Sequence, residues 1–389
     1  MSAIFGIYAP GEEVGRITYF ALKCLEHRGN EGAGIGVIRN GERVIFKEKG
    51  IVSQVFSEKW ISLLAKGEIG IGQVSSSDLI GPYEKDRMIF ASGENLFLNF
   101  EDADFISSIS ASLLVAEKGK LIGIRGGRKP LYLAKEVFKN QFYFAFATEI
   151  GALKFLRPKQ IKELNYGEGF IISEKGIRRL DIKLKEKKIC SFEFIFFSRP
   201  DNLIEGKLVE KVRRKLGILL AAQDVLEGPS KVDLVVSVPY SGDIFAEGYA
   251  RLLDLPLYRV VKNPHIISNV EPHPKIRNRD LRYAPIEEFL QGKRVVVVDD
   301  SIISGNKIKE FCQMLRERKV REIHLRIASP IVRSHCLDEK RKQLLGEKNE
   351  RKIKEILKVN SIRFLSISNL KKGIGLKNLC LDCFKKNEF

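Results

Sequence analysis

Two adjacent carboxylates, Asp299 and Asp300, follow four valines and precede a short loop rich in hydroxyl groups. The valines at 295–298 predict a fully buried strand, and open α/β sheets bind ligands at the carboxyl ends of their strands. The loop at 301–307 opens a predicted helix, so its N–H groups and hydroxyls form an anion cradle. Carboxylates can accept hydrogen bonds from ribose hydroxyls while such a loop holds a 5′-phosphate. The alternative is a strand whose aspartates merely cap the next helix.

The second half of the chain contains the elements that would position this motif. Apolar strands are predicted at 232–239, 256–261, 292–300 and 322–330, with amphipathic helices at 208–224, 245–253 and 305–319. This alternation predicts a parallel sheet covered by helices on both faces. The carboxylate pair would then lie at the carboxyl edge of that sheet.

The first half has a different pattern, with short strands separated by Gly, Asn and Asp. Strands are predicted at 4–9, 34–38, 43–50, 67–74, 120–127, 130–138 and 142–148, with one helix at 17–29. This pattern indicates antiparallel sheets with helices. A turn at 198–202 follows a further predicted strand at 192–197. We therefore predict two domains, at 1–198 and 199–389.

Composition limits the classes of function. The chain has 389 residues and no apolar run of about 18, the length that a membrane helix needs. Its first residues do not resemble a signal peptide, so we expect a cytoplasmic protein. Lys and Arg exceed Asp and Glu by 18 (67 against 49). That excess favours anionic partners such as nucleotides, phosphosugars or RNA, although a proteome rich in surface ion pairs gives a similar balance.

The carboxylate loop resembles the phosphoribosyl-diphosphate signature of type I phosphoribosyltransferases. Nearly the whole chain is similar to the amidophosphoribosyltransferases, the first committed enzymes of purine synthesis. The matching segments are Phe197-Ser198-Arg199-Pro200-Asp201, Val238-Pro239-Tyr240-Ser241-Gly242, Lys262-Asn263, Ser329-Pro330 and the run from Leu25 to Ile35. The resemblance implies an α+β domain like the N-terminal-nucleophile hydrolases, followed by a phosphoribosyltransferase domain. It also implies a homo-oligomer.

The resemblance also implies a substrate site that takes phosphoribosyl diphosphate or a purine nucleotide with Mg²⁺ on Asp299 and Asp300. The other implied substrate-binding residues are Ser301, Ser304, Gly305, Asn306, Lys307, Lys262 and Ser241. Ser304 replaces the family's arginine, Asn306 and Lys307 replace two threonines, and Tyr240 replaces an aspartate. The segment at 264–269 lacks the Tyr and Arg of the family's closing loop. We expect ligand binding to be retained, and transfer chemistry is left open.

The family's first domain hydrolyses glutamine with an N-terminal cysteine whose own α-amine is the base. Ser2 stands at that position, and Ser75 stands where the family has the arginine that holds the glutamine carboxylate. The family's oxyanion pair Asn-Gly becomes Ser92-Gly93. Loss of one oxyanion donor typically costs about 10²–10³ in rate. We therefore expect no glutaminase activity, and we interpret His27-Arg28-Gly29 as structural.

Four cysteines stand where one branch of the family holds a [4Fe–4S] cluster: Cys190, Cys336, Cys380 and Cys383. Four thiolates also suit a structural zinc ion. Unrelated buried thiols and disulfides are the further alternatives. Cys24 and Cys312 lie on helical patterns and are expected in the core.

Two hypotheses about function follow. In the first, the chain is a divergent member of the family that binds phosphoribosyl diphosphate or a purine nucleotide. Any phosphoribosylamine synthesis would then depend on ammonia or on an active paralogue as partner. In the second, it is a pseudoenzyme that binds RNA or the ribosome through its basic surface, with a steep dependence on salt. The sequence carries no aromatic and basic RNA-recognition motif, which places this hypothesis second.

Overall fold

The structure is a computed structural model, and it describes residues 2–93, 111–138, 142–184, 188–226, 231–262, 283–334 and 345–385. The described residues form two compact units. The first unit holds those up to 193 and also 197–209, whereas the second holds 194–196 and those from 210 onward. No helix within these ranges is long and apolar enough to cross a membrane.

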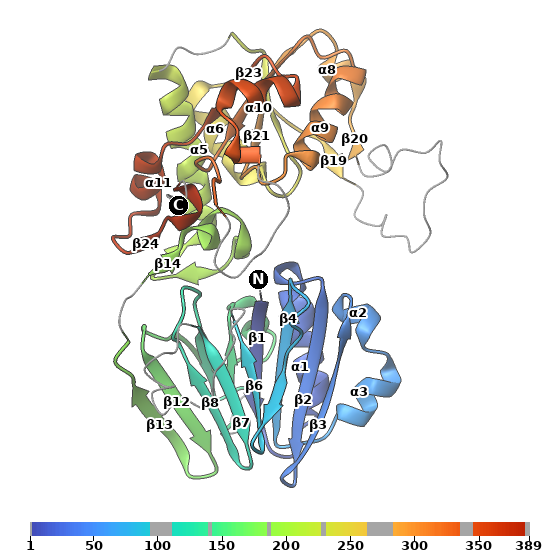
Figure 1. Cartoon of the computed structure of the whole chain (residues 1–389), viewed down its shortest axis with the longest axis vertical. Coiled ribbons are helices and arrows are strands. Elements are labelled where there is room, and N and C mark those ends of the chain that lie inside the picture. Colours follow the sequence, from blue (N-terminus) through green and yellow to red (C-terminus); the bar gives the residue numbers. More distant parts are fainter. Residues whose placement is uncertain are drawn as a thin grey trace. The chain divides into compact units, whose positions relative to one another are not determined.

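Two antiparallel sheets build the first unit (Figure 1). One sheet has the strand order β11 (Gln160–Glu163), β9 (Tyr132–Lys135), β10 (Phe144–Ala147), β1 (Ser2–Tyr8), β4 (Ile69–Ser75), β2 (Gly32–Arg39), β3 (Glu42–Lys49). The other has the order β13 (Gly176–Asp181), β12 (Glu168–Ser173), β8 (Lys120–Ile124), β7 (Leu113–Glu117), β6 (Met88–Ser92), β5 (Tyr83–Lys85). The prediction of antiparallel sheets is confirmed.

Apolar residues of β1 are buried on both faces of its sheet. Ile4 belongs to a core that also contains Leu114 and Leu121 of the second sheet, whereas Phe5 packs in a core with Leu22 of a helix. Because side chains alternate along a strand, β1 separates these two cores. The helical elements of this unit are α1 (Val14–Leu25), η1 (Glu26–Arg28), α2 (Val52–Val55), α3 (Glu58–Leu64) and α4 (Gly151–Lys154).

A parallel sheet forms the centre of the second unit, in the order β18 (Leu257–Arg259), β17 (Leu234–Ser237), β21 (Arg294–Asp299), β22 (Glu322–Ile327), β23 (Ser361–Phe364). The main helices are α5 (Val209–Leu226), α6 (Asp243–Leu253), α9 (Asn306–Glu317), α10 (Glu350–Leu357) and α11 (Ile367–Ile374). The shorter elements of the chain are β14 (Ile189–Cys190), β15 (Leu203–Ile204), β16 (Lys207–Leu208), β19 (Val261–Lys262), β20 (Tyr283–Ala284), α8 (Glu287–Leu290), η3 (Leu345–Glu347), β24 (Leu379–Cys380) and η4 (Asp382–Phe384).

The four valines of β21 are buried on both faces of this sheet, as predicted. Val295 and Val297 share a core with Phe311 of α9. The alternate valines face the opposite side of the sheet. Helix α6 contacts both β17 and β21. The carboxyl end of β21 is thus set between elements that cover both faces.

Two glycines bring α5 and α6 into direct backbone contact. A Cβ atom on Gly217 would lie 2.0 Å from the carbonyl oxygen of Phe245, and one on Gly248 would lie 2.1 Å from that of Arg214. Any larger residue at either position would force the helices apart. The two helices therefore pack as closely as their backbones allow.

The strand predicted at 192–197 is wrong. The structure has a π-helical turn there, η2 (Glu193–Phe197), closed by a hydrogen bond from the N–H of Ser198 to the carbonyl of Glu193. Phe194 and Ile195 are both buried, although neither belongs to a sheet. The apolar character of the run therefore reflects burial in a helical turn. A short apolar run in a sequence does not distinguish a buried strand from a buried helical turn.

Candidate functional site

Asp299 is the last residue of β21, and Asp300 follows it at the carboxyl edge of the parallel sheet. The hydroxyl of Ser241 donates a 2.7 Å hydrogen bond to Oδ1 of Asp299. The same oxygen accepts a 2.9 Å bond from the N–H of Asp300, and the hydroxyl of Ser301 lies 3.2 Å from Oδ2 of Asp300. The structure thus brings together four of the predicted site residues.

The loop between β17 and α6 is fixed by two local contacts. Asp243 accepts a 2.6 Å bond from the hydroxyl of Ser237 and a 2.9 Å bond from the N–H of Tyr240. A Cβ atom on Gly242 would lie 2.3 Å from the carbonyl oxygen of Val298, so only glycine fits there. Tyr240 has a φ of 68° and an exposed side chain. These contacts hold Ser241 against the end of β21.

Burial raises the pKa of the Asp299 carboxyl well above its ordinary value, and the charge of Asp300 raises it further. Burial also raises the pKa of the Asp300 carboxyl, although hydrogen bonds to that carboxyl and the positive charge of Arg213 oppose the shift. Two neighbouring carboxylates in a buried setting disfavour ionisation of both. A bound cation would reverse that preference, so the pair is suited to a metal ion together with a hydroxyl-bearing ligand.

The loop after Asp300 leaves its polar groups accessible. Ser304, Asn306 and Lys307 are exposed, and the N–H groups of 304–307 donate to no other described residue. Gly305 precedes α9 with a φ of 81°, a backbone conformation that favours glycine. These N–H groups lie at the start of a helix, where an anion is favoured. This geometry fits a phosphate cradle.

Two other predicted positions lie outside this arrangement. Lys262 ends β19, whose register pairs it with Tyr283 of β20. The segment at 264–269, which differs from the family's closing loop, lies outside the described residues.

At the carboxyl edge of the parallel sheet, the hydroxyl of Ser329 is fully buried and has no hydrogen-bond partner among the described residues. Ser329 follows Ala328, whose N–H donates to the carbonyl of Asp299 at 2.9 Å.

In the first unit, Ser2 is fully buried in β1, directly opposite Ser75 of β4. Ser75 is also buried, and its hydroxyl accepts a 3.1 Å bond from Nε2 of Gln73. A serine there offers no cation for a carboxylate. Two neutral side chains of β4, Gln73 and Ser75, therefore occupy the position where the family has the arginine that holds the glutamine carboxylate.

The N–H groups of the Ser92-Gly93 pair are both used inside the protein. That of Ser92 donates to Oε1 of Gln73 at 3.1 Å, and that of Gly93 donates to the carbonyl of Ser112 at 2.8 Å. The buried amine of Lys129 donates to the carbonyls of Gly93, at 2.5 Å, and Ser2, at 3.5 Å. Sequence reasoning missed Lys129, because a lysine in a Gly- and Arg-rich segment looks like a surface residue.

Arg28 is the centre of a buried ion-pair network. Its guanidinium lies 2.7 Å from Glu149 and 2.5 Å from Glu193, and all three side chains are inaccessible to solvent. The hydroxyl of Ser198 donates to Glu193 at 2.5 Å, and His27 contacts Glu149 at 3.0 Å. The segment 27–29 thus makes packing and ion-pair contacts, as its structural interpretation predicts.

Of the four candidate metal-binding cysteines, Cys336 lies outside the described residues. Cys190 ends β14 of the first unit, and Cys380 and Cys383 lie near the end of the second. The carbonyl of Cys383 accepts bonds from the N–H groups of Arg333, at 2.8 Å, and Ser334, at 3.2 Å. The described part of the chain contains no cluster of three metal-binding side chains.

Comparisons with known proteins agree with this description of two units. The model of the phosphoribosyl transferase domain family matches residues 210–360. The chain is 29% identical to an amidophosphoribosyltransferase of Methanocaldococcus jannaschii, over 98% of this chain and 96% of that protein. It is 30% identical to amidophosphoribosyltransferase 1 of Arabidopsis thaliana chloroplasts, over 98% of this chain and 77% of that protein.

Two solved structures share the fold over 98% of this chain. One is described as the allosteric regulatory enzyme of purine biosynthesis, with a TM-score of 0.86, 26% identity and 95% of its chain covered. The other is the glutamine phosphoribosylpyrophosphate amidotransferase of B. subtilis in complex with ADP and GMP, with a TM-score of 0.83, 25% identity and 96% covered.

Proposed function

Because this chain belongs to the amidophosphoribosyltransferase family, we propose that its second unit binds phosphoribosyl diphosphate or a purine nucleotide and that its first unit no longer hydrolyses glutamine. The observation that supports binding most directly is the 2.7 Å bond from Ser241 to Asp299 beside an open, helix-capping loop. It holds a carboxylate ready for ribose hydroxyls and Mg²⁺ while the loop receives a phosphate. The complex of the B. subtilis relative with two nucleotides is consistent with this class of ligand.

Loss of glutaminase activity is supported by the hydrogen bonds at three positions. The N–H groups of Ser92 and Gly93 already have acceptors, so neither can stabilise an oxyanion without breaking an internal bond. Ser75 carries no charge, so no ion pair can position the glutamine carboxylate there. Each loss alone lowers catalysis, and together they remove both positioning and electrostatic stabilisation.

Any transfer reaction in the second unit would use ammonia that does not come from the first. The nitrogen of ammonia would bond to C1 of the ribosyl group while the bond from C1 to the diphosphate oxygen breaks. The diphosphate would leave with the electron pair, and one proton would pass to solvent. Mg²⁺, when bound by Asp299 and Asp300 together with the ligand, would screen the charge of the leaving group. The alternative source of nitrogen is an active paralogue as partner.

The cysteine set is proposed to hold an iron–sulfur cluster as a structural staple, with zinc as the alternative. The bonds from Arg333 and Ser334 to the carbonyl of Cys383 place the segment that leads to Cys336 against the turn that carries Cys380 and Cys383. This contact supports Cys380 and Cys383 as members of one ligand set. Thiolates suit both an iron–sulfur cluster and zinc. Elemental analysis of anaerobically purified protein distinguishes the two.

Two measurements test the proposed function. Calorimetry with phosphoribosyl diphosphate and Mg²⁺ should give binding that is lost in the Asp299→Asn/Asp300→Asn variant. The matched control is Asp233→Asn, which removes a carboxylate paired with Arg294 at the other end of β21. An assay of phosphoribosylamine formation, run separately with ammonia and glutamine, should give no activity with glutamine. Absence of binding, or activity with glutamine, would refute the respective half of the proposal.

RNA or ribosome binding remains the second hypothesis, and its support is still the net charge of +18 alone. Binding of an RNA oligonucleotide that weakens steeply between low and moderate salt would favour it.

A further inference from the structure

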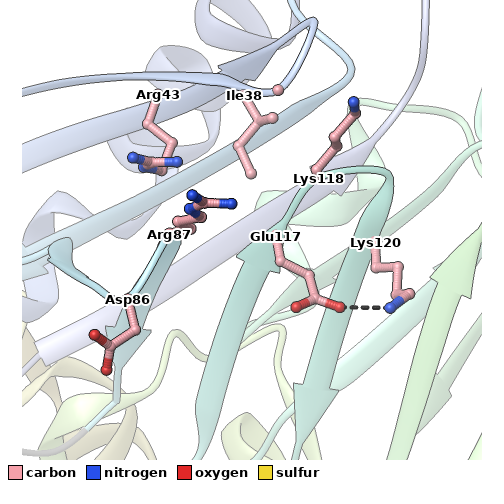
Figure 2. A pocket seen from close by; sticks show the side chains of 8 residues that line it. Ile38, Arg43, Asp86, Arg87, Glu117, Lys118 and Lys120 are labelled. Atoms are coloured by element: carbon pink, nitrogen blue, oxygen red, sulfur yellow. Dashed lines mark hydrogen bonds and ion pairs between the residues drawn. The ribbon is translucent and has the colours of Figure 1, made fainter.

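A depression of about 510 Å³ lies where three hairpin turns of the first unit meet (Figure 2). The turns are Asn40-Gly41 between β2 and β3, Asp86-Arg87 between β5 and β6, and Lys118-Gly119 between β7 and β8. Each joins two paired strands through two residues, so each is short and firmly held. The residues that line the depression are Ile38, Gly41, Arg43, Asp86, Arg87, Glu117, Lys118 and Lys120. We call this depression the hairpin pocket.

The hairpin pocket lies at the far end of both sheets from Ser2. Ser2 pairs with Ser75 at one end of β1, whereas Tyr8 at the other end pairs with Ile69. Ile38, which lines the pocket, also pairs with Ile69. Six strand residues separate the two ends, which corresponds to about 20 Å. The pocket is therefore separate from the positions that match the family's glutaminase site.

Basic side chains dominate the lining. Arg43 pairs with Glu84 at 2.5 Å, and Lys120 pairs with Glu117 at 2.7 Å. Arg87 and Lys118 form no ion pair with any other described residue. Figure 2 shows the guanidinium groups of Arg43 and Arg87 facing one another. Arg43 contacts Glu84 through Nε, so its terminal nitrogens, together with Arg87 and Lys118, can form charge-assisted contacts with an anion.

The backbone at Arg87 has a conformation that is uncommon for an arginine. Asp86 and Arg87 have φ values of 49° and 65°, as a two-residue turn of type I′ requires. Such turns favour glycine at the second position, and the neighbouring turn has it, with φ values of 50° at Asn40 and 83° at Gly41. Arg87 therefore occupies a left-handed position that glycine would fill without strain.

We propose that the hairpin pocket binds a small phosphorylated anion, a metabolite with a diphosphate or triphosphate group, through Arg43, Arg87 and Lys118. Its volume of about 510 Å³ leaves room for a diphosphate or triphosphate group. Glu117 and Asp86 provide acceptors for hydroxyl groups of such a ligand. The alkyl chain of Lys118 lies over Gly41, which holds the third cation at the rim.

Calorimetry with inorganic triphosphate in the absence of Mg²⁺ tests this site in the full chain. The Arg87→Gly variant should bind at least about tenfold more weakly at the pocket, since it loses a charge-assisted contact. Its thermal unfolding midpoint should stay equal to or rise above that of the wild type, because glycine suits the turn. Loss of binding through misfolding is thereby separated from loss of the ligand contact. Asp86→Asn should tighten binding.

The matched control is Lys49→Ala, which removes an exposed cation of β3 that pairs with Asp78 outside the pocket. It should leave triphosphate binding unchanged. The phosphate cradle of the second unit is intact in all these variants, so the difference between them reports the pocket alone. Equal binding in wild type and Arg87→Gly, or equal weakening in Lys49→Ala, would overturn the proposal. So would an Arg87-dependent RNA oligonucleotide complex without triphosphate binding.

Discussion

The hydroxyl of Ser241 donates its 2.7 Å hydrogen bond to Asp299, and this bond joins the loop after β17 to the end of β21. Two segments about 58 residues apart in sequence meet there. The bond also favours the ionised carboxylate, against the effects of burial and of Asp300, which raise its pKa. Ser241 therefore orients Asp299 and favours its ionised form.

The first prediction concerns this bond. Ser241→Ala should weaken binding of phosphoribosyl diphosphate with Mg²⁺ by about tenfold, because a hydrogen bond to a charged group contributes about 1.5–3 kcal/mol. Ser241→Thr keeps the hydroxyl and should bind within a fewfold of the wild type. Calorimetry of both variants measures the effect. Equal binding by the alanine and threonine variants would contradict the assigned role.

Asp299 should also impose a cost on stability. Its pKa is raised in the folded state, so the folded protein binds the proton more tightly than the unfolded chain. Protonation of Asp299 therefore stabilises the folded state. This stabilisation is complete below the pKa of the unfolded chain and is lost as pH rises through the raised pKa of the folded state. Asp299→Asn should therefore be more stable than the wild type at pH 8, with a smaller difference at pH 5. Thermal unfolding at both pH values measures this, and a difference that shrinks as pH rises would refute it.

Restoring the nucleophile should not restore glutamine hydrolysis. Ser2→Cys should release no ammonia from glutamine, because the N–H groups of Ser92 and Gly93 remain bonded to Gln73 and Ser112. The variant with Ser75→Arg added should also be inactive for the same reason. A coupled ammonia assay checks both, with an active family member as positive control. Activity in the single variant would show that the oxyanion site is still available.

The buried network of Arg28 should be sensitive to removal of its cation. Arg28→Met should cost about 3–5 kcal/mol of the free energy of unfolding, because Glu149 and Glu193 would remain buried without the cation that balances their charge. Arg16→Met breaks an ion pair with the exposed Glu58 and should cost much less, because solvent screens that pair. Denaturant unfolding of both variants compares them. Equal costs would mean that the network is not the source of the stability.

The loss of stability at acid pH should depend on the same network of Arg28, Glu149 and Glu193. Burial alone would raise the pKa of the Glu193 carboxyl, but the charge of Arg28 and its hydrogen bonds hold that pKa below the ordinary value. This stabilisation is present above the unfolded pKa and is lost as pH falls through the folded value. Glu193→Gln should thus flatten the loss of stability below about pH 4.

Cys312 should be chemically inert in the native protein. It is fully buried in α9, and burial raises the pKa of its thiol to about 12. Only the thiolate reacts, so iodoacetamide at pH 8 should leave Cys312 unmodified until denaturant is added. Mass spectrometry of the alkylated peptides measures this. Rapid modification of the native protein would show that α9 opens readily.

Much of this architecture is readable from the sequence, for identifiable reasons. The valines before Asp299 predict a buried strand because parallel strands are covered on both faces, and β21 has that form. The strand predicted at 192–197 is wrong because its apolar residues are buried in a π-helical turn. Lys129 could not be identified, since its burial depends on carbonyls of Ser2 and Gly93, which are distant in sequence.

The hairpin pocket was also beyond sequence reasoning. Its cations Arg43, Arg87 and Lys118 come from β3 and from two hairpin turns, which are dozens of residues apart, and only the folded sheets bring them together. The left-handed backbone at Arg87 leaves no mark in the sequence, because an Asp-Arg pair is not a usual signal for such a turn.

The glycine contact between α5 and α6 limits how the second unit can respond to a ligand. Because Gly217 and Gly248 leave no space between the two backbones, neither helix can slide or tilt against the other without a collision. Helix α6 begins directly after the loop that carries Ser241, so this close packing fixes one end of that loop. A screen for altered ligand preference should therefore vary the loop before it varies the two helices.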